Sequence, residues 1–244
     1  VLCSFKPLSE VSAGQWVPLL WTNNYAKVLS IEEISFAGWY WNSLFVTASV
    51  TLLQVLTSSL AAFSFSRLEW PGRDRFFLLY MGTTMLPGLV MMIPNYQLMV
   101  ALGLTDSLLG LILPSSFTAF GTFLLRQFML GLPKAIDEAA EIDGATTWQL
   151  FWEIILPLSR PGVISLAIFT FVGNYNSFFW PLVMLKSPHN YTLPVGLLFF
   201  NNSQGQEIPL LMAAAVMTML PMILLFLIFQ KQLVRGIQAG AVKG

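Results

Sequence analysis

The residues best suited to chemistry form one acidic cluster near the middle of the chain. The cluster comprises Asp137, Glu138, Glu141 and Asp143. On a helix, Asp137 and Glu141 lie four residues apart on one face, a spacing that could bind a hard cation. The only histidine, His189, and the only cysteine, Cys3, have no partners at metal-ligand spacing, and no further acidic motif completes a site. We therefore expect no metal and no catalytic residue, and a solvated helix that faces a partner is the more economical interpretation.

Nucleotide-binding motifs are missing from the sequence. It contains neither the phosphate-binding pattern GxxxxGK[ST] nor a GxGxxG flanked by strand and helix. If ATP energises the work of this protein, we expect another chain to bind it.

The composition indicates the elements that must position the acidic cluster. Hydrophobic residues make up 56% of the 244 and charged residues only 10%, against about 25% charged in a soluble domain. Five uncharged stretches of 19 to 33 residues occupy 34–66, 76–105, 107–125, 161–185 and 208–230. Roughly 20 apolar residues suffice to cross a bilayer as a helix. The sequence therefore predicts an all-α integral membrane helical bundle with spans at about 41–65, 76–100, 107–130, 161–185 and 209–231.

The distribution of lysine and arginine predicts the orientation of the spans. Nine basic residues fall in one set of alternate segments and three in the other, and cytoplasmic loops are the ones enriched in them. We thus expect an extracytoplasmic segment at 1–38, a membrane domain at 39–231 and a cytoplasmic tail at 232–244. Because five spans place the N-terminal segment outside, we also expect a sixth span to precede Val1 in the natural chain.

The long inner connection at 132–159 is too polar to span the bilayer. Its sequence predicts two short helices: Gly144 supplies a turn with positive φ, and Thr146 or Thr147 caps the second helix. We expect that helix to run to about Leu156 and to stop at Pro157. Two helices joined in this way form a compact knob at the membrane surface, and 132–159 is called the knob from here on.

Polar residues inside the spans are the candidates for a solute path. In the fourth span they are Asn174, Tyr175, Asn176 and Ser177, and weaker candidates in the third span are Ser115, Ser116 and Thr118. Polar side chains at this depth face a wet cavity or other helices, and hydrogen bonds between helices are an equally good interpretation. Apart from Arg126 and Lys231 near the ends of two spans, the spans contain no charged residue, which argues against an ion-coupled transporter. A kink or break is expected in the second span near Pro87, Gly88 and Pro94.

Several segments together resemble one family. They are AAFSFSR at 61–67, FLLRQF at 123–128, EAAEIDGATTWQLFWEIILPLSRPG at 138–162, YTLPVGL at 191–197, AAAVMTMLP at 213–221 and the ending LVRGIQAGAVKG. The long central segment is similar to the EAA loop of ATP-binding-cassette importer permeases, and the others are similar to the carbohydrate, maltose-type branch. The resemblance covers nearly everything after about Asn42.

The resemblance implies a permease subunit, not an enzyme, that moves a sugar or oligosaccharide across the cytoplasmic membrane by alternating access. It implies a second homologous permease, two ATPase subunits that bind ATP and Mg²⁺, and an extracytoplasmic solute-binding protein. The knob would dock on the ATPase, and the residues that inherit this role are Glu138, Ala139, Ala140, Asp143, Gly144, Leu156 and Pro157. The family usually has Trp-Asn where this chain has Tyr175-Asn176, which leaves the identity of the sugar open.

Two other functions stay open on the sequence alone. A permease for a non-carbohydrate solute, such as a phosphorylated or amphiphilic compound, would share the EAA loop. A membrane-embedded enzyme would need the acidic cluster to bind a metal ion.

Overall fold

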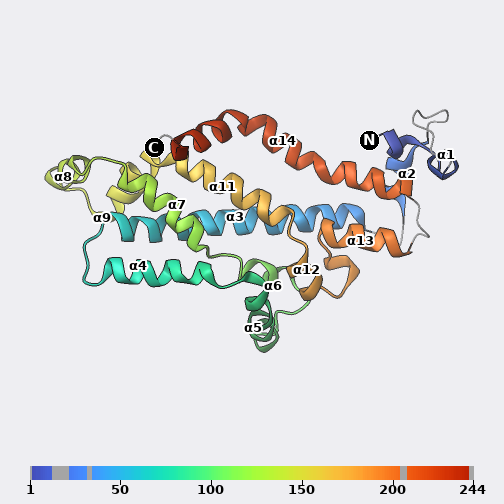
Figure 1. Cartoon of the computed structure of the whole chain (residues 1–244), viewed down its shortest axis with the longest axis horizontal. Coiled ribbons are helices and arrows are strands. Elements are labelled where there is room, and N and C mark those ends of the chain that lie inside the picture. The colour runs from blue at the N-terminus through green and yellow to red at the C-terminus, as the bar shows by residue number, and fades with distance from the viewer. Residues whose placement is uncertain (1, 13–21, 32–34, 204–207, 242–244) are drawn as a thin grey trace. The chain divides into compact units, whose positions relative to one another are not determined.

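A computed structural model describes residues 2–12, 22–31, 35–203 and 208–241 of the chain (Figure 1). Over these residues every regular element is a helix and none is a strand, so the predicted all-α fold is confirmed. Parts of the expected outer segment (1, 13–21 and 32–34) and of the tail (242–244) lie outside the described residues. The chain divides into two compact units, each described by itself. Unit 1 is Val1–Thr47, Leu98–Leu111 and Tyr175–Ile228, and unit 2 is Ala48–Gln97, Ile112–Asn174 and Phe229–Gly244.

The helices are labelled in chain order in Figure 1. In the first half of the chain they are α1 (Leu8–Ser12), α2 (Asn24–Ser30), α3 (Phe36–Ser66), α4 (Arg73–Gly82), α5 (Gly88–Ala101), α6 (Leu108–Ile112) and α7 (Ala119–Leu130). In the second half they are α8 (Ala135–Ile142), α9 (Thr147–Gln149), α10 (Leu156–Leu158), α11 (Arg160–Tyr175), α12 (Phe179–Met184), α13 (Leu193–Ser203) and α14 (Ile208–Ala241). Short 3₁₀ turns occupy Leu2–Phe5, Thr83–Met85 and Pro188–Asn190, and a π-helical stretch occupies Leu150–Ile155.

Among the described residues, two helices are long and apolar enough to cross a membrane unbroken. They are α3 and the part of α14 at Ile208–Gln230. The stretches predicted as spans at 41–65 and 209–231 lie within α3 and α14. Apolar runs of this length have no polar face to offer water, which is why they form continuous helices suited to lipid.

The second predicted span is sharply bent. Helices Arg73–Met85 and Gly88–Ala101 meet at 98°. The bend lies at Leu86 and Pro87, where the proline lacks an N–H and the preceding residue is forced into an extended conformation. The kink expected near Pro87 and Gly88 is therefore confirmed, whereas Pro94 lies inside α5 without ending it.

The third and fourth predicted spans each contain a break in the helix. Between α6 and α7, residues 113–118 are not helical. Pro114 removes a backbone donor there, and the side chain of Thr118 accepts a hydrogen bond from Gly121 N–H and so starts a new helix. Between α11 and α12, residues 176–178 are not helical. The limits of the membrane-crossing segments stay predictions for these stretches.

The core of unit 2 joins α3, α7, the π-helical stretch and α11. Its buried residues are Ala62, Phe63, Leu125, Met129, Phe151, Ile155 and Leu166. The rings of Phe63 and Phe151 lie 5.1 Å apart and tilted by 56°, a favourable aromatic arrangement. Because Phe151 and Ile155 belong to the knob, the knob is held by the same core as the membrane helices.

Gly162→Ala is expected to destabilise this core, whereas Gly173→Ala in the same helix is not. A Cβ at Gly162 would lie 2.6 Å from ring atoms of Phe128, while a Cβ at Gly173 meets nothing within 4 Å. Overpacking of a core costs about 1–3 kcal/mol, and Gly→Ala in an open helical position gains about 0.5–1 kcal/mol. Thermal unfolding of the purified variants in detergent measures both, and equal midpoints would contradict the close packing of α7 and α11.

Unit 1 contains a network of hydrogen bonds around Asp106. The Asp106 carboxylate accepts bonds from Lys186 N–H at 2.8 Å, from Ser187 N–H at 2.9 Å and from the Ser187 hydroxyl. Asn190 Nδ2 donates to the Asp106 carbonyl at 2.6 Å. Trp39 Nε1 of α3 donates to the Pro188 carbonyl at 2.6 Å. The connection between α12 and α13 is therefore tied both to Asp106 and to the start of α3.

Asp106→Asn is expected to lower the thermal midpoint of the protein at pH 7. The hydroxyl and N–H of Ser187, followed by Lys186 N–H, hold the pKa of the Asp106 carboxyl below its usual range. A carboxyl pKa lowered by folding adds stability above the unfolded pKa of about 3.9, and this stability is lost as the pH falls toward the folded pKa. The difference between wild type and variant should therefore be full at pH 7 and shrink below about pH 4. A pH-independent difference in the unfolding midpoint would contradict this role of the carboxylate.

Candidate functional site

The turn inside the knob follows the sequence prediction. Gly144 has φ +77°, and its N–H bonds to the Glu141 carbonyl at 3.0 Å as α8 ends. Thr146 then caps the next helix: its hydroxyl accepts Gln149 N–H at 3.3 Å, and Gln149 Oε1 accepts Thr146 N–H at 2.9 Å. This reciprocal pair is a capping box. The predictions of a glycine turn and a threonine cap are both confirmed.

The predicted end of the second helix is wrong. The helix does not stop at Pro157 but continues through α9, the π-helical stretch and α10 to Leu158, where the chain turns by 75° into α11. A π-helical stretch interrupts the regular i→i−4 ladder just before Pro157, so the missing N–H of the proline is accommodated. Leu156 is half-buried and Pro157 is exposed.

The base of the knob is fixed by Arg67 at the end of α3. Its Nη1 donates to Asp137 Oδ2 of α8 at 2.5 Å, and its Nη2 donates to the Leu132 carbonyl at 3.0 Å and to the Met129 carbonyl. The Arg67 side chain is only 4% exposed. One planar guanidinium thus joins three points of the chain, which a lysine could not do. The sequence did not predict this role, although Arg67 is one of the nine basic residues that orient the spans and ends the motif AAFSFSR at 61–67.

The knob directs most of its predicted docking residues to the surface. Glu138, Ala139, Asp143 and Gly144 are exposed. Ala140 differs, because it is 6% exposed and faces the chain's own interior. Its small side chain therefore lets α8 sit close to its own support and offers no surface to a partner.

Apolar residues that the sequence analysis did not single out also lie on the surface of the knob. Ile142 is 86% exposed, and Trp148, Trp152 and Leu158 are exposed as well. Exposed apolar groups beside acidic ones are typical of a protein interface.

One carboxylate of the acidic cluster is paired with an arginine. Asp137 Oδ2 lies 2.5 Å from Arg67 Nη1, whereas the interpretation as a metal site pairs Asp137 with Glu141 around a cation. In the described part of the chain, no group of three or more histidine, cysteine, aspartate or glutamate residues is placed to hold a metal ion. The interpretation as a membrane-embedded metal enzyme loses the feature on which it depended.

In unit 2 the polar residues of the membrane helices form a connected network. Gln54 of α3 lies at its centre: its Nε2 donates to the Ser115 carbonyl at 2.5 Å, and its Oε1 accepts from the Thr170 hydroxyl at 3.0 Å. Asn174 Nδ2 in turn donates to the Thr170 carbonyl at 2.9 Å. Gln54 was not among the predicted site residues. A long amide side chain inside an apolar span is costly to leave without a partner, and this feature of the sequence could have marked Gln54 as a candidate.

Two more of the candidates in unit 2 bond to the backbone. The Ser116 hydroxyl is buried and donates to the Ile112 carbonyl at 2.7 Å. The Thr118 side chain caps α7. These contacts fit the interpretation that Ser and Thr satisfy their own helix.

In unit 1 the aromatic candidate is buried. Tyr175 is 2% exposed, and its hydroxyl donates to the Thr218 carbonyl of α14 at 2.8 Å. Asn176 is exposed and Ser177 is half-buried in the break before α12. The hydroxyl of Tyr175 thus joins two helices in this conformation.

Comparison with known proteins identifies the family. The model of the family described as "Binding-protein-dependent transport system inner membrane component" matches residues 11–239. The chain belongs to this family. The match spans both units and includes the whole knob, and the family description makes the chain a component of a transport system.

Relatives of this inner membrane component include transport permeases for several solutes. The arabinooligosaccharides transport system permease protein AraQ of Halalkalibacterium halodurans is 34% identical, with 100% of this chain and 89% of that protein covered. The trehalose/maltose transport system permease protein MalG of Thermococcus litoralis is 35% identical over 91% of this chain and 81% of that protein. The sn-glycerol-3-phosphate transport system permease protein UgpE of Yersinia enterocolitica is 34% identical over 90% of this chain and 80% of that protein.

A solved structure has the same fold. A chain of a bacterial ABC transporter involved in the import of the acidic polysaccharide alginate superposes with a TM-score of 0.85 at 23% identity, covering 94% of this chain and 87% of that one. The all-α permease fold of this inner membrane component is therefore shared with a known importer.

Proposed function

We propose that this chain is the permease subunit of an ATP-driven importer for a sugar or oligosaccharide, and that the knob couples it to an ATPase. The observation that carries the proposal is the knob itself. It is rigid at its base through Arg67, turned at Gly144, and exposes acidic and apolar side chains at its outer surface. Such a surface suits a groove in a partner that has basic and apolar residues.

The remaining subunits follow from the same proposal. ATP and Mg²⁺ are bound by two ATPase subunits, a second homologous permease completes the pathway, and an extracytoplasmic binding protein delivers the solute. Closure of the ATPases on ATP moves the knob, and the shared core of unit 2 transmits the movement to α3, α7 and α11. In this orientation the knob and the C-terminus are cytoplasmic.

The knob residues have two kinds of role in this proposal. Glu138, Ala139, Asp143 and Gly144 contact the ATPase, because they are exposed. Ala140 and Leu156 act by positioning the two helices, and Pro157 lies at the exposed end of the second one.

Neutral polar groups would line the solute path. The network around Gln54 in unit 2, with Asn174, Ser115, Ser116 and Thr118, and the group Tyr175, Asn176 and Ser177 in unit 1 offer amides and hydroxyls but no charge. Amides and aromatic rings suit the hydroxyl groups and apolar faces of sugars. Two of the relatives reported above carry sugar names, which supports the same substrate class.

The alternative is a permease for a phosphorylated solute, which the glycerol-3-phosphate relative favours. Uptake into proteoliposomes that contain the complete importer and its binding protein separates the two. We expect ATP-dependent uptake of an arabino- or malto-oligosaccharide and none of sn-glycerol 3-phosphate. Uptake of the phosphate ester alone would replace the carbohydrate assignment, and uptake without ATP would contradict both.

A further inference from the structure

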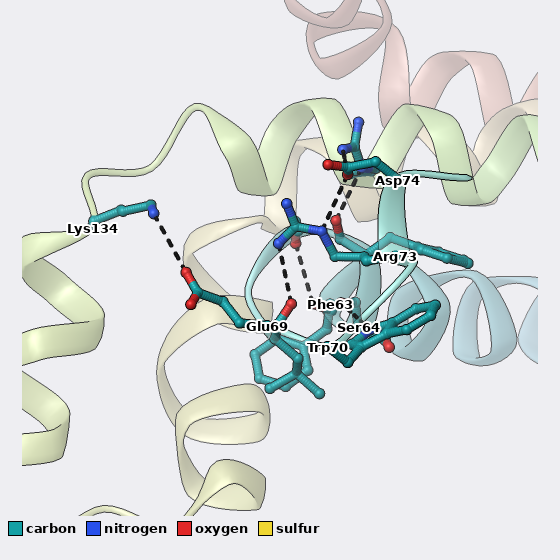
Figure 2. A network of polar contacts seen from close by, with 11 residues as sticks. Phe63, Ser64, Glu69, Trp70, Arg73, Asp74 and Lys134 are labelled. Atoms are coloured by element: carbon teal, nitrogen blue, oxygen red, sulfur yellow. Dashed lines mark hydrogen bonds and ion pairs between the residues drawn. The ribbon is translucent and has the colours of Figure 1, made fainter. Parts of the chain in front are cut away.

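The connection between α3 and α4 forms an open polar cavity at the surface that the proposed transport function does not use. Its volume is about 610 Å³, and it is lined by Glu69, Trp70, Gly72, Arg73, Asp74 and Arg75. We call this cavity the basin. Figure 2 shows Arg73 beside Asp74, and Glu69 extended toward Lys134 of the knob.

Two arginines and two acids line the basin, and both acids are paired with cations. Asp74 is shared by two arginines, with Arg73 at 3.2 Å and Arg126 at 3.5 Å. Glu69 faces Lys134 at 4.0 Å. Arg75 is exposed and forms no ion pair within the described residues. Each carboxylate therefore already has a cation, and the guanidinium of Arg75 remains for an anion from outside the chain.

A second cavity adjoins the basin at Trp70. It has a volume of about 410 Å³ and is lined by Thr57, Ala61, Phe65, Trp70, Phe76, Tyr80 and Phe117. We call it the groove. Trp70 lines both cavities, with its ring 5.7 Å from Phe76 and 5.8 Å from Phe65. A polar, cationic compartment thus continues into an apolar, aromatic one.

The outer surface of α4 matches lipid. No residue of α4 is buried, and Phe76, Leu78 and Leu79 are exposed. Tryptophan is enriched where membrane meets water, and arginines there attract anionic headgroups. The basin therefore lies at headgroup depth if α4 contacts the acyl chains.

We propose that the basin and the groove together bind one anionic phospholipid. Its phosphate contacts Arg75, with Arg73 beside it, because guanidinium groups match phosphate oxygens in pairs. Its acyl chain lies in the groove against Phe65, Phe76 and Trp70. A free phosphate would use only the basin and a subunit helix only the groove, whereas an anionic lipid accounts for both. With the knob on the cytoplasmic side, as proposed above, this lipid belongs to the cytoplasmic leaflet. The binding of the lipid does not depend on that orientation.

Native mass spectrometry of the full-length chain in its purified membrane assembly tests the proposal. The probes are phosphatidylglycerol and phosphatidylcholine, added separately. We expect tighter binding of phosphatidylglycerol, and Arg75→Gln should weaken it about fivefold, since one arginine near an anionic surface contributes about that much. Arg160→Gln, which removes an exposed arginine outside both cavities, should leave it unchanged. Ala61→Phe narrows the groove and should weaken both lipids.

Each contrary result has a distinct meaning. Equal binding of the two lipids, or equal effects of Arg75→Gln and Arg160→Gln, would overturn the proposal. Displacement of phosphatidylglycerol by inorganic phosphate would show that the groove contributes nothing and would also overturn it. Cross-linking of an Ala61→Cys variant to the second permease would show that a protein fills the groove. These lipid measurements do not require a docked ATPase. Failure of the transport proposal can therefore be distinguished from failure of the lipid proposal.

Discussion

Gly144→Val is expected to abolish ATP-driven uptake while the chain still inserts into the membrane. Gly144 has φ +77°, which a β-branched residue strongly resists. The position is sterically open, because a Cβ there meets nothing within 4 Å. The strain of about 1–3 kcal/mol therefore comes from the backbone alone, and it is relieved by reorienting α8 against α9. We expect uptake in proteoliposomes to fall by about 5- to 150-fold, since a strain of this size changes an equilibrium constant by that factor.

Gly144→Asn is the matched control, because asparagine tolerates positive φ. It adds a side chain of similar size at the same exposed position and should keep most of the uptake. If Val and Asn lowered uptake equally, contact at the surface and not the turn would explain the effect. If neither changed uptake, the turn would have no role in coupling.

Arg67→Met is expected to lower the free energy of unfolding by about 3 kcal/mol. The change leaves the Asp137 carboxylate and the carbonyls of Met129 and Leu132 without their donor, in a place where the Arg67 side chain is almost fully shielded from water. A group buried without its partner loses its hydration and gains nothing in return. Unfolding of the chain in detergent, followed by circular dichroism, measures the loss.

Two further variants show whether the pair is responsible for this loss. Adding Asp137→Leu to Arg67→Met removes the stranded carboxylate and should recover part of the stability. Lys134→Met breaks the ion pair with Glu69, whose side chains are both exposed, and should change stability by less than about 1 kcal/mol. Similar losses for Arg67→Met and Lys134→Met would contradict the account of the knob's base.

The predictable parts of the fold are those set by local chemistry. The lengths of the apolar runs are sufficient to predict α3 and α14, because no soluble packing suits them. Gly144 and Thr146 specify the turn of the knob through positive φ and capping, which depend on neighbouring residues alone. Pro87 predicts the bend before α5 in the same way.

The features that the sequence did not predict depend on contacts between distant residues. Pro157 lies in α10, two residues after the π-helical stretch Leu150–Ile155, and no single-residue rule anticipates such a stretch. The burial of Ala140 and the role of Arg67 arise from the approach of α8 to the end of α3, about 70 residues away in the sequence. Gln54 of α3 connects to Ser115 in the break between α6 and α7 and to Thr170 of α11.

The most direct test of the account is co-purification of an ATPase from membranes in mild detergent. Three forms are compared: the native chain, the double variant Glu138→Lys with Gly144→Asp, and the control Lys186→Glu with Gly103→Asp. The control reverses the charge of an exposed side chain outside the knob and makes the same change at a glycine with φ +67° and no atom within 4 Å of its Cβ position. We expect the ATPase with the native chain and the control, and not with the knob variant. Retention of the ATPase by the knob variant, or its absence from all three well-folded forms, would contradict the assignment of the knob as the docking element.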